Sequence, residues 1–263
     1  MKSTGNPPPQ HPVHLPTPAQ AFAALLRTLV IVLFLITFLI QPYLIPSESM
    51  EHTLLVGDFL FVNKQILAPS DTLARLILPY REVRRGDIVV FHHPRPSLLI
   101  KRVAGIPGDR IRVDNGHLSV NGVRVLEPYA TFEPTAYNPS RDVFPSTSYS
   151  DPNVNPEWWY KLPSLVQNGE LVVPPNQYFV LGDNRNHSDD SRFWGLVPRQ
   201  AIVARPLLIY FSLRRPSTTD VEQVENEKAL SDKAPDDKLG HDRELTAKLV
   251  GFARWERIFR VVR

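Results

Sequence analysis

The sequence predicts an all-β domain of short antiparallel strands, preceded by one N-terminal transmembrane helix. Three observations lead to this fold class: a long uncharged apolar run near the N-terminus, a series of short β-branched and aromatic runs after it, and two Asn-Gly dipeptides between strand-like runs. The chain has 263 residues, of which 43% are hydrophobic, and this is enough to bury a sizeable core.

The N-terminal part is predicted to be a tail followed by a membrane anchor. Residues 1–20 are polar, rich in proline and without an apolar period, which favours a flexible tail. No charged residue occurs from Thr28 to Ser47, and about 20 apolar residues in a helix span a bilayer core of about 30 Å. We therefore expect a transmembrane anchor over 21–45. A cleaved signal peptide is the alternative, but the run is long for one and no Ala-x-Ala-like site follows it.

The charges around this run predict its orientation. Lys2 and Arg27 precede it, and the first acidic residue of the chain is Glu48. The positive-inside rule then favours a cytoplasmic N-terminus. The expected location is the cytoplasmic (inner) membrane, crossed once, with the following domain outside the cytoplasm.

The domain is expected over 46–213 and reads as short strands separated by turns. The Asn115-Gly116 and Asn121-Gly122 dipeptides each predict a tight hairpin, because Asn-Gly favours the turn that joins two twisted strands. An insertion at about 127–169, rich in Pro, Tyr and Ser, is expected to be irregular. The β-branched or aromatic runs, each bounded by Gly, Pro or Asp, lie at 58–62, 87–93, 98–105, 170–173, 178–182 and 201–211.

The last part of the chain has two predicted segments. Residues 214–243 are polar with charges of both signs, which favours a solvated linker or surface segment. Residues 244–263 are interpreted as amphipathic, because on a helical wheel apolar residues share one face and arginines the other. The segment either docks onto the β domain or lies on an anionic membrane surface. The apolar face holds Phe252, Trp255, Ile258, Phe259 and Val262, and the polar face holds Arg254, Arg257 and Arg260.

Composition excludes several classes of function. The formal net charge is +3, and its positive residues are dispersed instead of forming the basic stripe that nucleic-acid binding requires. The chain has no Cys, so a disulfide framework, a thiolate nucleophile and a Cys-ligated zinc site are excluded. His92 and His93 are adjacent in a predicted strand and point to opposite faces, so they do not form one metal site. We expect no metal, no cofactor and no nucleic-acid partner.

Three stretches contain residues suited to chemistry. "PSESM" at 46–50 places Ser49 directly after the apolar run, and Lys101 lies in a strand-like run that is otherwise apolar. Burial disfavours the charged form of a lysine and lowers its pKa, so Lys101 is a candidate general base. His52 is a nearby alternative base, but it lies in the Ser49 segment itself. The third stretch, "GDNRNHSDDSRFWG" at 182–195, combines turn formers with charges of both signs and is predicted to brace a neighbouring site.

These stretches together resemble the type I signal peptidases, which are membrane-anchored Ser-Lys proteases of peptidase family S26. The resemblance rests on "PSESM" after an apolar run, on "KRVAGIPGD" at 101–109 and on "GDNRNHSDDSRFWG", in this order. It is supported by "GD" at 57–58 and "RGDIVVF" at 85–91, and it covers roughly 28–213. One departure is Asn176-Gln177, where the family often carries a glycine; Asn tolerates the left-handed conformation that such a position requires.

The resemblance implies a role for each matching residue. Ser49 corresponds to the nucleophile and Lys101 to its general base. Ser47 corresponds to the residue whose hydroxyl joins the Ser49 N–H in the oxyanion hole, and Ser188 to the serine that orients the lysine amine. Asp183, Asp190 and Arg192 correspond to structural ion pairs. The apolar residues that line the pockets for small substrate side chains, chiefly Ala, correspond to Ile45, Pro46, Met50, Leu54 and Ile100.

The resemblance therefore implies a metal- and cofactor-independent serine endopeptidase that removes signal peptides at Ala-x-Ala-type sites through an acyl-enzyme. Its expected partners are preprotein signal peptides delivered by the export machinery, and membrane lipid. A catalytically inactive, membrane-anchored binding or scaffold protein on the same β fold is the alternative. A self-cleaving repressor-type Ser-Lys protease is disfavoured, because the chain has the predicted anchor and lacks a helical DNA-binding domain.

Overall fold

The computed structural model describes residues 17–38, 40–64, 81–94, 96–133, 136–146, 151–214 and 252–262. The chain forms two compact units, Met1–Leu39 and Ile40–Arg263. In the first unit, helix α1 (Pro18–Phe38) includes most of the uncharged apolar run. Among the helices that the structure describes, none is both long enough and apolar enough to span a membrane. Residues 1–16 of the predicted tail lie outside the described residues.

The end of the predicted anchor belongs to the second unit. Helix α1 ends at Phe38, and strand β1 (Ile40–Leu44) pairs antiparallel with β2 (Asp58–Asn63). The expectation of one helical anchor over 21–45 is therefore wrong for its last residues. Pro42 explains the change, because proline lacks the N–H that a helix interior needs and is accommodated in an edge strand such as β1. Hydropathy alone does not distinguish a lipid-facing run from an apolar strand.

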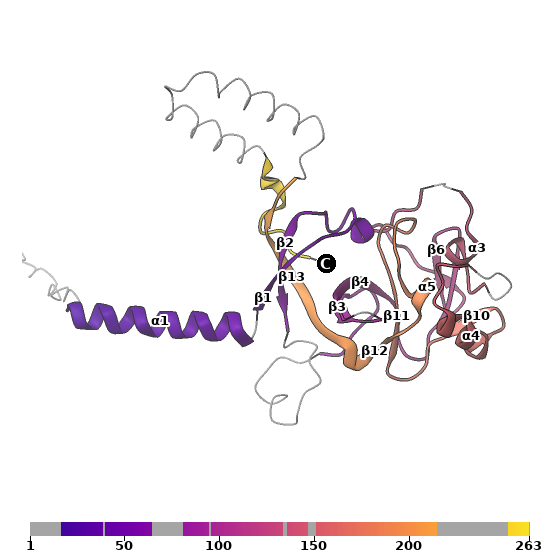
Figure 1. Cartoon of the computed structure of the whole chain (residues 1–263), viewed down its shortest axis with the longest axis horizontal. Coiled ribbons are helices and arrows are strands. Elements are labelled where there is room, and N and C mark those ends of the chain that lie inside the picture. Colours follow the sequence, from indigo (N-terminus) through magenta and orange to yellow (C-terminus); the bar gives the residue numbers. More distant parts are fainter. Residues whose placement is uncertain are drawn as a thin grey trace, which may run out of the picture. The chain divides into compact units, whose positions relative to one another are not determined.

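The second unit is mostly β, as the sequence predicts. Its first sheet is antiparallel and has the order β1-β2-β13-β3-β4-β11-β12. Strand β13 pairs with β2 along one part of its length and with β3 along another, and its register shifts between these pairings, so the sheet curls (Figure 1). The remaining strands are β3 (Ile88–His92), β4 (Leu98–Gly105), β11 (Gln177–Leu181), β12 (Val197–Pro198) and β13 (Ile202–Ser212).

The second sheet contains the two predicted hairpins, which the structure confirms. Asn115 and Gly116 have φ values of 47° and 75°, and Asn121 and Gly122 have values of 54° and 78°. This pair of left-handed residues is what the tight hairpin turn requires. The sheet order is β7-β6-β5-β10-β9 with β8 paired to β5, and its strands are β5 (Arg110–Asp114), β6 (His117–Val120), β7 (Val123–Arg124), β8 (Val143–Phe144), β9 (Val166–Gln167) and β10 (Glu170–Val172).

The insertion at 127–169 contains two helices that the sequence reasoning missed. Helix α3 (Pro139–Asp142) and helix α4 (Pro156–Leu165) each begin with an Asn-Pro pair. The asparagine side chain accepts a hydrogen bond from a backbone N–H of the first turn, and the proline occupies a position where no N–H is needed. These two Asn-Pro pairs were the signal that could have predicted the helices. Trp158 and Leu162 of α4 pack into the core beside the second sheet.

The C-terminal residues 252–262 dock onto β13. Isolated bridges join Val261 to Leu208 and Ala253 to Leu213, and the short 3-10 turn η3 (Trp255–Arg257) lies between the two bridges. The expected division into an apolar and an arginine face is not kept, because Arg257 is buried while Phe259 is exposed. Backbone pairing with β13 and ion pairs decide which side chains turn inward. Most of the predicted 214–243 linker, and residues 244–251, lie outside the described residues.

Candidate active site

Ser49 and Lys101 come from two separate elements and meet at a hydrogen bond. Ser49 lies in the short turn η1 (Glu48–Met50), which follows β1 along the chain, and Lys101 lies in the middle of β4. The distance between Lys101 Nζ and Ser49 Oγ is 2.6 Å. Both residues are buried, at 4% and 7% exposure respectively. The Met50 carbonyl accepts hydrogen bonds from the amides of Thr53 and Leu54, which fixes the turn that carries the serine.

The environment of Lys101 makes its amine easy to deprotonate. Burial lowers the pKa of Lys101 to about 8, against the weaker opposing effect of the carboxylates of Asp190 and Asp189. Near pH 8, therefore, a large fraction of the molecules holds a neutral amine beside the Ser49 hydroxyl. A neutral amine at hydrogen-bond distance from a hydroxyl is able to accept its proton.

Ser47 lies at the open side of this pair. Its Oγ is 3.5 Å from Ser49 Oγ, and its backbone is extended. In contrast to Ser49, the residue is exposed. A hydroxyl in this position is able to donate to an oxyanion that forms as Ser49 reacts.

Ser188 lies close to the pair without bonding to it. Its Oγ is buried and makes no hydrogen bond to the Lys101 amine, so the expected contact is not found; the Ser188 hydroxyl instead helps to lower the pKa of Asp190. Gly182, which the sequence analysis did not single out, explains how closely these parts pack. A Cβ at position 182 would overlap with Ser188 Oγ and with the carbonyl oxygen of Ser49. That carbonyl also accepts a hydrogen bond of 3.2 Å from the Asn184 amide.

A buried ion pair holds Asp183 beside the nucleophile turn, the segment 48–57 that carries Ser49 and leads into β2. Arg102 binds Asp183 through two hydrogen bonds of 2.8 and 2.7 Å, and Thr53 Oγ1 donates to the same carboxylate at 2.6 Å. Arg102 also donates to the Gly86 carbonyl. Arg102 was missed from sequence, although its place in a buried strand directly after Lys101 indicates a partner. The pair ties β4, the turn after Ser49 and the 182–195 loop together.

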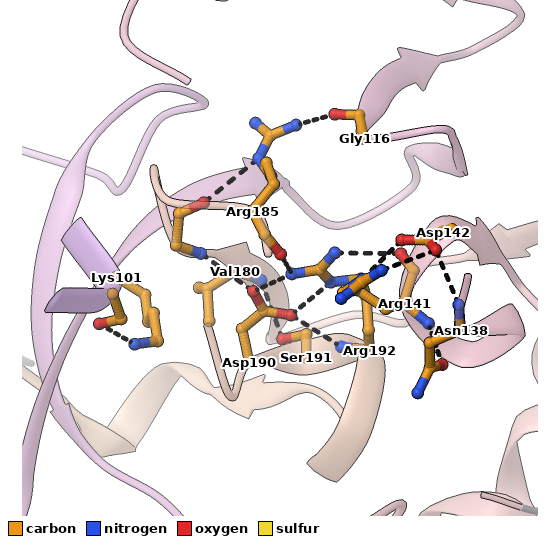
Figure 2. A network of polar contacts seen from close by, with 12 residues as sticks. Lys101, Gly116, Asn138, Arg141, Asp142, Val180, Arg185, Asp190, Ser191 and Arg192 are labelled. Carbon is orange, nitrogen blue, oxygen red and sulfur yellow. Dashed lines mark hydrogen bonds and ion pairs between the residues drawn. The ribbon is translucent and has the colours of Figure 1, made fainter. Parts of the chain in front are cut away.

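Another buried ion pair lies inside the 182–195 loop. Asp190 and Arg192 are both fully buried and share two hydrogen bonds of 2.8 Å. Burial opposes the ionisation of Asp190, but the guanidinium of Arg192 outweighs it and holds the pKa of Asp190 below its usual value. Arg192 Nη2 also donates to the Arg185 carbonyl, and Arg185 donates to the Gly116 carbonyl of the second sheet (Figure 2). These contacts fix the loop as one unit near Lys101.

A small apolar pocket opens next to the reacting pair. Its volume is about 40 Å³, which leaves room for only a small group. Tyr43 closes part of it, with its hydroxyl donating to the Leu98 carbonyl at 2.8 Å. Leu54, which was expected in this pocket, instead packs fully buried in the core behind the turn. The lining residues are Tyr43, Ile45, Pro46, Ser47, Ser49, Met50, Leu98, Leu99, Ile100 and Lys101.

Neither the alternative base nor a metal site belongs to this arrangement. His52 is exposed, has a φ of 78° and lines a separate cavity of about 400 Å³, together with Tyr129 and Arg260. Across the part of the chain that the structure describes, no group of three or more His, Cys, Asp or Glu side chains is arranged to hold a metal ion.

A buried serine hydroxyl beside a buried lysine amine defines a candidate hydrolase site, and comparison with known proteins identifies its family. A family model described as signal peptidase, peptidase S26, matches residues 19–211. Signal peptidase I of Haemophilus influenzae is 34% identical over 254 residues, covering 75% of this chain and 71% of that protein. Signal peptidase I of Aquifex aeolicus is 32% identical over 224 residues, covering 73% of this chain and 83% of that protein. The chain therefore belongs to the signal peptidases of family S26 and is a peptidase.

Proposed function

We propose that the protein is a serine endopeptidase that removes signal peptides with a Ser49–Lys101 dyad. The observation that carries the proposal is the 2.6 Å contact between Ser49 Oγ and Lys101 Nζ in a buried setting. Because burial lowers the lysine pKa to about 8, the base needs no carboxylate partner to become neutral. Membership of the signal peptidase family supports the substrate class.

The reaction proceeds in two steps. Neutral Lys101 takes the Oγ proton as Ser49 attacks the carbonyl carbon of the residue before the scissile bond, and the Ser49 amide and Ser47 hydroxyl stabilise the oxyanion. The lysine then protonates the leaving amine as the C–N bond breaks and a serine ester remains. In the second step, Lys101 accepts a proton from a water that attacks the ester. Collapse of this intermediate, with the proton returned to Ser49 Oγ, releases the signal peptide.

The pocket beside Ser49 is proposed to select the residue before the cut. A volume of about 40 Å³ with apolar walls favours alanine over larger side chains. Extended substrate would lie between the segment that ends at Ser49 and the start of β4, because both contribute to the walls. This proposal accounts for the alanine directly before the cut in an Ala-x-Ala-type site.

The location and partners follow from the same function. We propose that the part of the uncharged apolar run that precedes β1 anchors the chain in the cytoplasmic membrane, with its N-terminus in the cytoplasm and the β unit outside. Preproteins delivered by the export machinery would then present their cleavage sites at the membrane surface. Holding enzyme and cleavage site in one plane favours their encounter.

Cleavage of a purified preprotein with an Ala-x-Ala site tests the proposal. Wild type is compared in detergent and in lipid with Ser49→Ala, Lys101→Met and the control His52→Ala, and the new N-terminus is sequenced. We expect cleavage after the small residue by wild type and His52→Ala, and none by the other two. Binding of the preprotein without cleavage by wild type would favour the scaffold alternative. Full turnover by Lys101→Met would disprove the dyad.

A further inference from the structure

We infer that Arg257, in the C-terminal segment 252–262, is a positioning residue that holds the turn carrying Ser49. The inference rests on the proposed function, because it assigns the segment a part in the Ser49 reaction. The segment lies beyond residues 19–211, which the family model matches. Its hydrogen bonds nevertheless reach the nucleophile turn, which carries Ser49.

Arg257 is held by a buried carboxylate at the far end of the nucleophile turn. Asp58 has no exposed surface and accepts hydrogen bonds from both Nε and Nη2 of Arg257, the former at 3.0 Å. The Ser212 hydroxyl and the Leu55 amide donate to the same carboxylate at 2.6 and 2.8 Å. A two-pronged arginine–carboxylate contact fixes orientation as well as distance. Asp58 thus anchors the guanidinium against the strand that follows the turn.

The same guanidinium reaches the interior of the turn. Arg257 Nη2 donates to the Thr53 carbonyl at 3.0 Å, while the Thr53 hydroxyl donates to Asp183 at 2.6 Å. Asp183 in turn pairs with Arg102, the residue after Lys101. Thr53 is therefore held by its backbone from the C-terminal segment and by its side chain from the network beside the base.

Holding Thr53 in place affects the position of Ser49, because the two residues belong to the same hydrogen-bonded turn. Its amide and that of Leu54 both donate to the Met50 carbonyl, so the turn is continuous from Ser49 to Thr53. Val262, at the other end of the segment, packs in the apolar cluster that contains Met50 and Leu54. A displacement of about 1 Å at a reacting group reduces rates by roughly 10²-fold. Loss of Arg257 would allow such a displacement of Ser49 Oγ from Lys101.

Arg254 holds the same turn at a second point. Its Nη2 donates to the carbonyls of Val56 and Leu213 at 2.6 and 2.7 Å. The close packing of Gly57 against the Leu213 carbonyl leaves no room for a Cβ there. Both ends of the 53–58 turn are thus fixed by arginines of one segment, although the segment is almost 200 positions away in the chain.

Kinetics of full-length variants in detergent test the inference. The variants are Arg257→Gln, Arg257→Lys and the matched control Arg260→Gln, which removes an exposed arginine from the same segment. kcat and KM are measured separately with the Ala-x-Ala preprotein, about 20 °C below each thermal midpoint. We expect kcat to fall by roughly 10- to 100-fold for Arg257→Gln with KM changed less than about twofold. Arg257→Lys should be faster than Arg257→Gln but slower than wild type, because lysine keeps the positive charge but cannot form the two-pronged contact with the Asp58 carboxylate.

Two results would overturn the inference. A folded Arg257→Gln variant with wild-type kcat would mean that the segment contributes only stability, and so would an equal loss of kcat in Arg260→Gln. If Arg257→Gln does not fold, the kcat of Arg257→Lys is used in its place, and a wild-type value in that variant would overturn the inference. Ser49→Ala separates this from the proposed function: if it abolishes cleavage while Arg257→Gln does not affect kcat, only the positioning role fails. If Ser49→Ala still cleaves, the dyad itself fails.

Discussion

Lys101 and Arg102 are neighbours on β4, each only 4% exposed, and each contacts a different part of the site. Successive side chains of a strand point to opposite faces, so Lys101 bonds to Ser49 while Arg102 pairs with Asp183. Both contacts lead to the same short turn. Lys101 bonds to Ser49 in this turn, and Asp183, the partner of Arg102, accepts a hydrogen bond from Thr53 in the same turn. Strand β4 thus positions both the Lys101 amine and the turn that carries Ser49.

Activity is expected to rise with pH through about 8. The reacting form of Lys101 is the neutral amine, and burial lowers its pKa to about 8. Below that pH the lysine is mostly protonated and kcat/KM should fall about tenfold per pH unit, while above it kcat/KM should level off. Steady-state rates on the preprotein between pH 6 and 10 check this. A profile flat across pH 8, or one that falls there, would contradict a lysine base.

Lys101→Met is expected to remove activity and raise stability. The folded pKa of about 8 lies below the ordinary 10.5, so between these values the unfolded chain binds more protons and wild-type stability rises with pH. Methionine fills the site without a charge to desolvate, so the gain over wild type should be largest below pH 8 and shrink above it. Each kcal/mol of gain corresponds to a rise of about 2–4 °C in the thermal midpoint. Midpoints of both proteins at pH 7 and pH 10 measure the difference.

Gly182→Ala is expected to disrupt the site by overlap alone. A methyl group at position 182 overlaps with Ser188 Oγ and the Ser49 carbonyl, so the Ser49 backbone must shift from the position in which Ser49 Oγ meets Lys101. We expect kcat to fall by roughly 10²-fold and the protein to lose about 1–3 kcal/mol of stability. Gly169→Ala is the control, because position 169 has a φ of 75° but open space around it. It should lose stability through backbone strain and keep its kcat; equal kcat values for the two variants would refute the steric explanation.

The sequence predicted the strands and hairpins well, because short β-branched runs and Asn-Gly turns are local signals. It also predicted that Ser49 and Lys101 act together, but this came only from the resemblance to the type I signal peptidases, since no local rule links residues 52 positions apart. Arg102 and Gly182 were missed because their roles depend on which strand or loop packs against them. The end of the anchor was misplaced for a related reason: Ile40–Leu44 continues the uncharged run, and although Pro42 argues against a helix, its pairing with β2 is what shows that it is a strand.

Ile45→Ala and Leu54→Ala are expected to separate substrate selection from core packing. Both residues were predicted to line the substrate pocket and both belong to one core cluster, but of the two only Ile45 also lines the cavity beside Ser49. Ile45→Ala should widen the pocket and allow cleavage after residues larger than alanine, with a gain of roughly 10-fold or more in relative kcat/KM for a valine-containing site. Both variants should lose about 2–5 kcal/mol of stability, because both truncate a buried side chain, but Leu54→Ala should keep the wild-type preference. Competition between alanine and valine preproteins, with denaturant unfolding of both variants, distinguishes the two roles; a changed preference in Leu54→Ala would place that residue in substrate selection after all.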